Sequence, residues 1–307
     1  MRARIGAYVA LTKPRIIELL LITTVPTMIV AERGLPSLWL IAATVWGGTM
    51  AAGGANAINM YVDRDIDRVM ERTKGRPLVT GAMTPRAALT FAIALEIVAF
   101  LFLWATVNLL SAVLAVAACM FYVFVYTLWL KRTSSRNIVI GGTAGAVPTL
   151  IGWSSVTGTL DWAPVILFAI IFYWTPPHFW ALAIRYRDDY ASVDVPMLPV
   201  VESLRNTSVR ILGYTLLLWA LTVLFSPVAG MGHVYLGSAI VLGAVFTWYA
   251  VRLLRMQDPQ VGVSGGGAAT AEVEVRATAM RLFTWSITYI TLLFGAMALD
   301  QLLRSGW

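Results

Sequence analysis

The sequence predicts an all-α membrane protein whose helices cross the bilayer about nine times and bundle around a cavity open to the cytoplasmic side. Of the 307 residues, 59% are hydrophobic and only 13% are charged, and this charged share is about half that of soluble domains. Apolar runs of about 20 residues, the length that a helix needs to cross a bilayer, recur along the chain. The runs lack the period-two alternation of barrel strands, so helices are predicted rather than a barrel.

The predicted spans follow one another from the N-terminus to the C-terminus, and residues 1–307 are interpreted as one membrane domain. The basic start MRARIGAYVALTKPR is followed by no small-residue cleavage site, which argues against a signal peptide. The fifth run is the weakest, because GGTAGAVPTLIGW consists mostly of small residues and contains a proline. The predicted spans cover residues 16–32, 37–60, 88–107, 109–130, 138–157, 163–184, 209–228, 234–254 and 282–303.

Several prolines fall inside these spans, and Pro176-Pro177 predicts a break near the end of the sixth. Irregular backbone at membrane depth is tolerated mainly where it lines a cavity or is buried in protein. The prolines therefore favour the cavity on the cytoplasmic side. Clusters of small residues such as WGGTMAAGGANAIN have a simpler explanation, since small side chains let membrane helices pack closely.

Basic residues lie almost entirely on one side of the predicted bundle. Of the 23 Lys and Arg residues, all except Arg33 and Arg304 fall before the first span, after an even-numbered span, or, for Arg210 and Arg252, within three residues of such a loop. Because basic loops stay in the cytoplasm, we expect a multi-pass cell-membrane protein with its N-terminus in the cytoplasm and its C-terminus on the far side. Topology thus explains the net charge of +7, and no nucleic-acid partner is expected.

The stretch NMYVDRDIDRVMERTKGRPL, residues 59–78, concentrates charge directly after the second span. Asn59, Asp63 and Asp67 recur every four residues, so a helix that continues from the span would place them on one face. Such oxygen ligands suit Mg²⁺, which takes one or two protein carboxylates together with substrate phosphates. The plainer alternative is an ordinary loop whose acids pair with its own arginines.

The cations that follow the aspartates, Arg72, Lys74 and Arg76, suit phosphate oxygens. Arg64 is a further candidate, although it lies off the face of the aspartates. Acids and bases beside an apolar bundle therefore favour a lipid diphosphate, with its head on the metal ion and its tail in the membrane.

A second acidic loop, RYRDDYASVDVPMLPV, is predicted on the same side of the membrane. Asp188 and Asp189 could supply the remaining metal ligands there, and Arg185 and Arg187 could contact the diphosphate. Two acidic loops on the same side of the membrane favour a metal and diphosphate site over an ordinary loop whose acids pair with its own arginines.

These segments resemble the UbiA superfamily of intramembrane prenyltransferases. Asn59-x3-Asp63-x3-Asp67 followed by RTKGRPL is similar to the first aspartate-rich motif of that superfamily. The segments YTLWLKRTSSRNIVIGGTAGAVPTLIGW, TPPHFWALAIRYRDDY and VPMLPVV resemble the members that farnesylate haem b, and the similarity runs from about residue 10 to about residue 200. The resemblance implies a nine-helix fold, Mg²⁺ as cofactor, and farnesyl diphosphate and haem b as substrates.

The resemblance also implies roles for the charged residues. The implied catalytic residues are Asp63, Asp67 and Asp189. The implied metal ligands are these three with Asn59 and Asp188. The implied diphosphate-binding residues are Arg64, Lys74, Arg76, Lys131, Arg185 and Arg187. Many superfamily members carry a second Asp-x3-Asp motif, but Arg185 stands where its first Asp is expected, so the ligands of a second metal ion stay open. The farnesyl cation would add to a haem vinyl carbon, and water would complete haem O.

His178, in TPPHFWALAI near the cytoplasmic end of the sixth span, is the candidate haem ligand. An ionisable residue inside a membrane is a functional-site candidate, and imidazole ligates haem iron. The alternative is a packing residue with a satisfied hydrogen bond. His233 lies on the far side and is interpreted as incidental. Glu18 and Glu96 are expected to be buried acids paired within the bundle.

Two other functions compete with haem farnesylation. A prenyltransferase of the same fold acting on a quinone or aromatic precursor is the nearer alternative, and TPPHFWALAI argues against it. A secondary transporter would also have many spans, but transporters usually place ionisable residues near the midplane of the membrane. The ionisable residues of this chain cluster instead at the cytoplasmic end of the predicted bundle. Contact with a haem A synthase as partner is left open.

Overall fold

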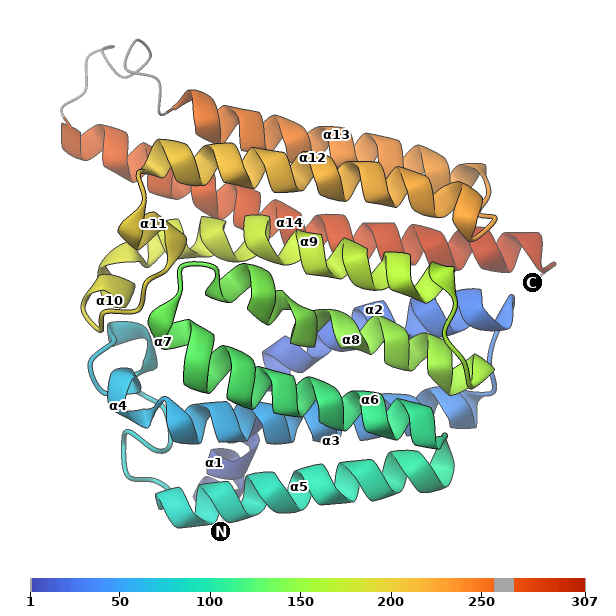
Figure 1. Cartoon of the computed structure of the whole chain (residues 1–307), viewed down its shortest axis with the longest axis horizontal. Coiled ribbons are helices and arrows are strands. Elements are labelled where there is room, and N and C mark those ends of the chain that lie inside the picture. Colours follow the sequence, from blue (N-terminus) through green and yellow to red (C-terminus); the bar gives the residue numbers. More distant parts are fainter. Residues whose placement is uncertain (1, 257–267, 307) are drawn as a thin grey trace.

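The computed structural model describes residues 2–256 and 268–306, and every regular element within these ranges is a helix (Figure 1). This confirms the all-α prediction. In the described residues, 8 helices are long and apolar enough to cross a membrane, so the chain is a multi-pass membrane protein. They are α3 (Leu38–Val62), α5 (Pro85–Thr106), the continuous helix Leu109–Thr133, α8 (Asn137–Thr157), α9 (Trp162–Arg185), α12 (Leu204–Val228), α13 (His233–Arg255) and α14 (Ala268–Arg304).

The first predicted span corresponds to α2 (Pro14–Glu32). The apolar part of α2 that the structure describes, Leu21–Glu32, is shorter than a full crossing. The count of nine spans therefore stays a prediction. A short helix, α1 (Arg2–Thr12), precedes α2 and packs its Ala7 and Leu11 against α3.

Connections between the long helices alternate between the two ends of the bundle (Figure 1). The C-terminus lies at one end, on the right of the picture. The other end, on the left, carries the two polar loops 63–84 and 186–203, and we call it the charged end. Its short elements are α4 (Arg64–Asp67), the 3-10 turn η1 (Glu71–Thr73), α7 (Lys131–Thr133), α10 (Arg187–Ala191) and α11 (Leu198–Val201).

Short polar side chains start most of the long helices. Ser37, Thr84, Asn108, Asp161 and Ser203 each accept a hydrogen bond from a backbone N–H in the first turn of the helix that follows. Such caps satisfy donors that the helix itself leaves free. They fix the residue at which each of these helices begins.

The predicted break at the proline pair is wrong. Helix α9 runs without interruption from Trp162 to Arg185 through Pro176 and Pro177. Each proline removes one backbone donor, but α8, α12 and α14 pack around α9 and support it. The cytoplasm-facing cavity therefore cannot be inferred from broken helices, and it stays a prediction.

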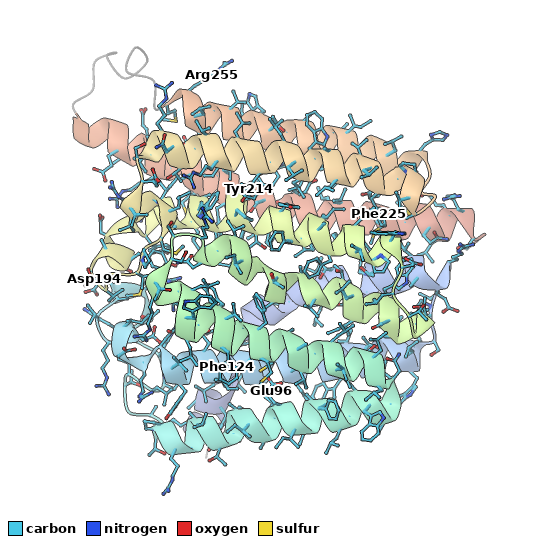
Figure 2. The ribbon with its side chains drawn as sticks, viewed as in Figure 1. Glu96, Phe124, Asp194, Tyr214, Phe225 and Arg255 are labelled. Carbon is cyan, nitrogen blue, oxygen red and sulfur yellow. The ribbon has the colours of Figure 1, made fainter. Side chains whose placement is uncertain are left out.

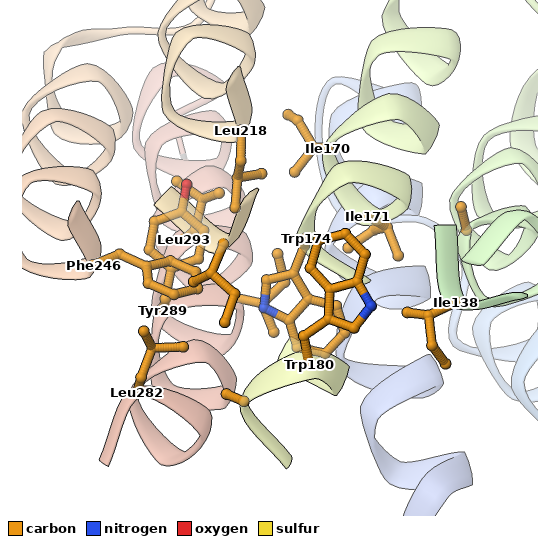
Figure 3. Packing of buried hydrophobic residues seen from close by; sticks show 14 of the residues in the cluster. Ile138, Ile170, Ile171, Trp174, Trp180, Leu218, Phe246, Leu282, Tyr289 and Leu293 are labelled. Atoms are coloured by element: carbon orange, nitrogen blue, oxygen red, sulfur yellow. The ribbon is translucent and has the colours of Figure 1, made fainter. Parts of the chain in front are cut away.

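The largest buried cluster lies where α9 packs against α12 and α14 (Figure 3). Trp174 and Trp180 project from α9, Leu218 from α12, and Tyr289 and Leu293 from α14. All five side chains are at most 4% exposed. Close packing of large rings makes this part of the bundle rigid.

Helices α3 and α5 approach closely at Gly54 and Glu96 (Figure 2). A Cβ atom at Gly54 would lie 2.5 Å from Glu96 Oε1, so a larger residue there would force the Glu96 side chain to move. Both carboxyl oxygens of Glu96 are buried without a hydrogen-bond partner among the described residues. The Cys119 thiol and the backbone of Ala55 interact with the Glu96 carboxyl, so the expected pairing of Glu96 within the bundle stays a prediction. Glu18 is exposed rather than buried.

Candidate active site

The end of α3 holds the two central carboxylates. Asp63 ends the helix, with its N–H bonded to Asn59 O, and Asp67 N–H bonds in turn to Asp63 O. The chain thus keeps turning in helical steps, and the three side chains share one face as the spacing predicts. Asp63 is 0% exposed and Asp67 is 2% exposed. Charges buried this deeply require partners.

Cations from two other segments neutralise these carboxylates. Lys131 Nζ forms an ion pair with Asp63 Oδ2, and Arg132 Nη2 lies 3.8 Å from Asp63 Oδ1. Arg76 Nη1 lies 2.5 Å from Asp67 Oδ2. The cluster therefore combines the aspartate-rich stretch with α7, which is distant in sequence but adjacent in space.

A π-helix carries the chain to Lys131. The segment η2 (Phe121–Leu130) continues α6 (Leu109–Met120) with π-helical hydrogen bonding, which is rare and is frequently found at functional sites. Thr127 Oγ1 donates to Tyr122 O at 2.8 Å and accepts from Asn59 Nδ2 at 3.2 Å. The rings of Tyr122 and Tyr126 stack with centroids 5.4 Å apart.

Lys13 is a member of this cluster that the sequence analysis missed. Its Nζ donates to Asn59 Oδ1 at 2.8 Å, while Asn59 Nδ2 donates to Asp63 Oδ2 at 2.8 Å. Burial, reinforced by the neighbouring Arg76 and Lys131 cations, lowers the pKa of Lys13 to about 7. Lys13 precedes Pro14 where the first span begins, on the same side as the acidic loops, and that position was the available signal.

The second polar loop touches the first, as its placement on the same side predicts. The Arg72 guanidinium lies over the rings of Tyr186 and Tyr190, and Arg72 Nη2 donates to Tyr190 Oη at 3.2 Å. Asp189 Oδ2 accepts from Arg72 N at 3.4 Å. Asp188 instead pairs with Arg276 of α14 at 2.8 Å.

The remaining predicted cations lie outside the Asp63–Asp67 cluster. Lys74 is exposed and pairs with Glu71. Arg64 donates to Tyr61 O at 2.6 Å and lies over the Tyr61 ring. Arg185 and Arg187 are exposed at the charged end. Their roles in diphosphate binding stay predictions.

The cluster fits a Mg²⁺ ion that is completed by substrate. Asp63 Oδ1 is buried and accepts no hydrogen bond from the described residues. Arg132 Nη2 lies 3.8 Å away, at ion-pair distance, so a metal ion at this oxygen would replace that longer contact and break no hydrogen bond. Within the described ranges, no three His, Cys, Asp or Glu side chains gather closely enough to hold a metal ion. Mg²⁺ does not require three, because one or two carboxylates plus substrate phosphates are its usual protein site.

Comparison with known proteins identifies the fold and the family. A sequence model described as the UbiA prenyltransferase family matches residues 20–264. The chain belongs to this family. UbiA prenyltransferases transfer prenyl groups, so the chain is a prenyltransferase, in agreement with the resemblance of its aspartate-rich stretch.

Relatives of this UbiA prenyltransferase match it over almost the whole chain. A protein named Protoheme IX farnesyltransferase from Parafrankia sp. (strain EAN1pec) is 55% identical over 300 residues, which cover 98% of this chain and 91% of the relative. Proteins of the same name from Frankia alni and Streptomyces avermitilis are 55% and 52% identical, over 97% and 98% of this chain and 98% and 95% of their own lengths.

Solved structures share the UbiA fold at low sequence identity. The structure of a digeranylgeranylglyceryl phosphate synthase has a TM-score of 0.77 at 16% identity, covering 99% of this chain and 100% of the other. A UbiA homologue from Archaeoglobus fulgidus bound to DMAPP and Mg²⁺ has a TM-score of 0.63 at 15% identity, covering 93% and 99%. At such identities the similarity supports the fold alone.

His178 lies deeper in this UbiA prenyltransferase than the charged cluster. It precedes Arg185 at the charged end of α9 by about two helical turns. The side chain is 6% exposed, and its Nδ1 lies 2.7 Å from Ser286 Oγ of α14. Ser286 is a second residue that the sequence analysis missed, since no pattern in α14 pointed to it.

Proposed function

We propose that this prenyltransferase transfers the farnesyl group of farnesyl diphosphate to a vinyl group of haem b and thereby makes haem O. The observation that carries the proposal is the identity of 50–55% with near-full-length relatives named Protoheme IX farnesyltransferase. The buried cluster of Asp63, Asp67 and their cations supports it, because it is suited to a diphosphate held beside an apolar bundle.

In the first step Asp63 and Asp67, with Asn59 beside them, would hold a Mg²⁺ ion that the diphosphate helps to bind. The ion supplies positive charge to the oxygens that become more negative as the allylic C–O bond breaks. Lys131, Arg76 and Lys13 already surround the carboxylates. When substrate and metal enter, these cations exchange carboxylate partners for diphosphate oxygens and stabilise the leaving group.

In the second step the farnesyl cation forms a bond to the terminal vinyl carbon of haem b. Water adds to the adjacent carbon and loses a proton, which leaves a hydroxyethylfarnesyl arm. The stacked rings of Tyr122 and Tyr126 lie on the π-helix that leads to Lys131. Aromatic faces there stabilise an allylic cation by cation–π attraction while bulk water is kept out. In this proposal Asp189 and Asp188 complete the metal ligands, and His178 binds the haem iron.

The direct test is to incubate the purified protein with haem b, farnesyl diphosphate and Mg²⁺, and to measure the porphyrin product by mass. We expect haem O, and no product when Mg²⁺ is removed with a chelator. A quinone or aromatic acceptor offered in competition should not be prenylated. Prenylation of that acceptor with unmodified haem would favour the alternative acceptor, and no product from any acceptor would contradict the proposal.

Lys13→Ala is expected to weaken farnesyl diphosphate binding. The variant loses a charge-assisted contact worth about 1.5–3 kcal/mol, which corresponds to roughly a ten- to hundredfold rise in Kd. Binding of haem should be unchanged. The matched control is Arg86→Ala, which removes an exposed cation at the same end of the bundle. Equal effects of the two variants on Kd would mean that Lys13 acts only through overall charge.

Topology can be tested with reporter tags. We propose that the charged end faces the cytoplasm, so a tag within residues 72–76 should report cytoplasm and a tag after Trp307 the far side. A tag in 262–267, a segment outside the described residues, should also report cytoplasm. If a tag at Met1 and the tag after Trp307 report the same side, the number of crossings is even and the prediction of nine is wrong.

A further inference from the structure

Hydrogen bonds around His178 determine which of its ring nitrogens carries a proton. Nδ1 lies 2.7 Å from Ser286 Oγ, and the same Oγ lies 2.6 Å from the backbone oxygen of Phe283. A carbonyl oxygen only accepts, and a serine hydroxyl has a single proton to donate. That proton therefore lies on the bond to Phe283, and Ser286 Oγ must accept from His178 Nδ1–H.

Aromatic rings hold the imidazole on both faces. Trp174 stacks on one face with centroids 4.3 Å apart, and Phe283 stacks on the other at 4.5 Å. Trp174 Nε1 in turn donates to Ser286 O at 2.8 Å, and Figure 3 shows Trp174 between α9 and α14. Ser286 thus orients both the imidazole and one of the rings that enclose it.

The opposite edge of the imidazole is left available. The described contacts of His178 include no carboxylate, so the buried ring is neutral and Nε2 carries a lone pair. No hydrogen-bond partner among the described residues occupies Nε2. Histidines that bind a metal through one nitrogen almost always donate the other ring N–H to a fixed acceptor.

We propose that Ser286 is a positioning residue that locks His178 in the Nδ1–H tautomer and so presents Nε2 to the iron of the haem substrate. The inference rests on the proposed function, because it takes haem as the acceptor. A serine that served only packing would need just its bond within α14, as Ser208 has with Leu204 O in α12. Ser286 differs because its hydroxyl is also the acceptor for a ring N–H of another helix.

The tautomer can be measured without haem. The chain contains only 2 His residues, so ¹⁵N-histidine labelling gives a spectrum of two imidazoles, and His233→Asn assigns them. We expect His178 Nδ1 to be protonated and Nε2 unprotonated in the parent protein. In Ser286→Ala the two tautomers should exchange. A parent His178 protonated at Nε2, or a tautomer unchanged by Ser286→Ala, would overturn the proposal.

Haem titration tests the consequence for substrate. Ser286→Ala should weaken haem binding about tenfold or more and shift the Soret band, while farnesyl diphosphate binding stays the same. Ser208→Ala, which removes an equally buried hydroxyl, should do neither. In a His178→Ala background, Ser286→Ala should have no further effect on haem affinity. An equal loss in both backgrounds would mean that Ser286 does not act through the imidazole.

The outcomes separate this inference from the proposed function. If the parent makes haem O and His178→Ala lowers haem affinity, but Ser286→Ala matches the parent in spectrum and affinity, only the role of Ser286 is wrong. If the parent prenylates no haem, the proposed function is wrong. The NMR spectrum then still shows whether Ser286 sets the tautomer of His178, but the tautomer has no bearing on haem.

Discussion

Asp63→Asn is expected to lower the rate of farnesyl transfer about a thousandfold or more, because the substitution removes the most buried negative charge of the cluster. It should also lower stability, since Lys131 would remain near the protein interior without its partner. Breaking a buried ion pair from one side typically costs about 3–5 kcal/mol. Product formation by mass and thermal unfolding in detergent measure the two effects separately.

A double variant separates catalysis from folding. Asp63→Asn with Lys131→Met replaces both charges of the pair, so the unfolding temperature should recover toward that of the parent while transfer stays absent. Glu202→Gln is the control, because Glu202 pairs with Arg210 at 3.5 Å and has no described contact with the cluster. Recovery of transfer in the double variant, or turnover by Asp63→Asn at limiting Mg²⁺, would show that Asp63 is structural.

His178→Ala is expected to lose haem binding, seen as a changed Soret band and at least a tenfold weaker Kd. Farnesyl diphosphate binding should be retained, because the Asp63–Asp67 cluster comes from other helices. The space left by the side chain should admit free imidazole, so added imidazole should partly restore the haem spectrum. His233→Ala, at the start of α13, is the control and should match the parent.

Other results would assign His178 differently. A lower unfolding temperature with unchanged haem affinity and spectrum would make it a packing residue between Trp174 and Phe283. Normal haem binding with lost turnover would favour a proton-transfer role, for which imidazole is suited.

The helices and the aspartate face could be predicted because they depend on local patterns. Apolar length determines spans, and a four-residue spacing places Asn59, Asp63 and Asp67 together on any helix. Lys13 and Ser286 could not be found this way. Each acts through a partner about 46 or 108 residues away along the chain, and one sequence does not reveal such a contact.

The proline pair failed as a signal for a different reason. Pro176 and Pro177 disfavour a helix in isolation, but packing of α9 against three neighbours outweighs that local preference. Inside a bundle, the tertiary environment decides whether a proline bends a helix.

The enclosure around His178 is built from α9 and α14 alone, and these two helices supply no described contact to the Asp63–Asp67 cluster. If the proposed roles hold, His178 and the Asp63–Asp67 cluster separate acceptor recognition from donor recognition along the chain. Changes in α9 and α14 around His178 could then alter the acceptor during evolution without disturbing the Asp63–Asp67 cluster. A chimera that takes both helices from another UbiA protein is accordingly a rational starting point for an enzyme that attaches the same prenyl chain to a new acceptor.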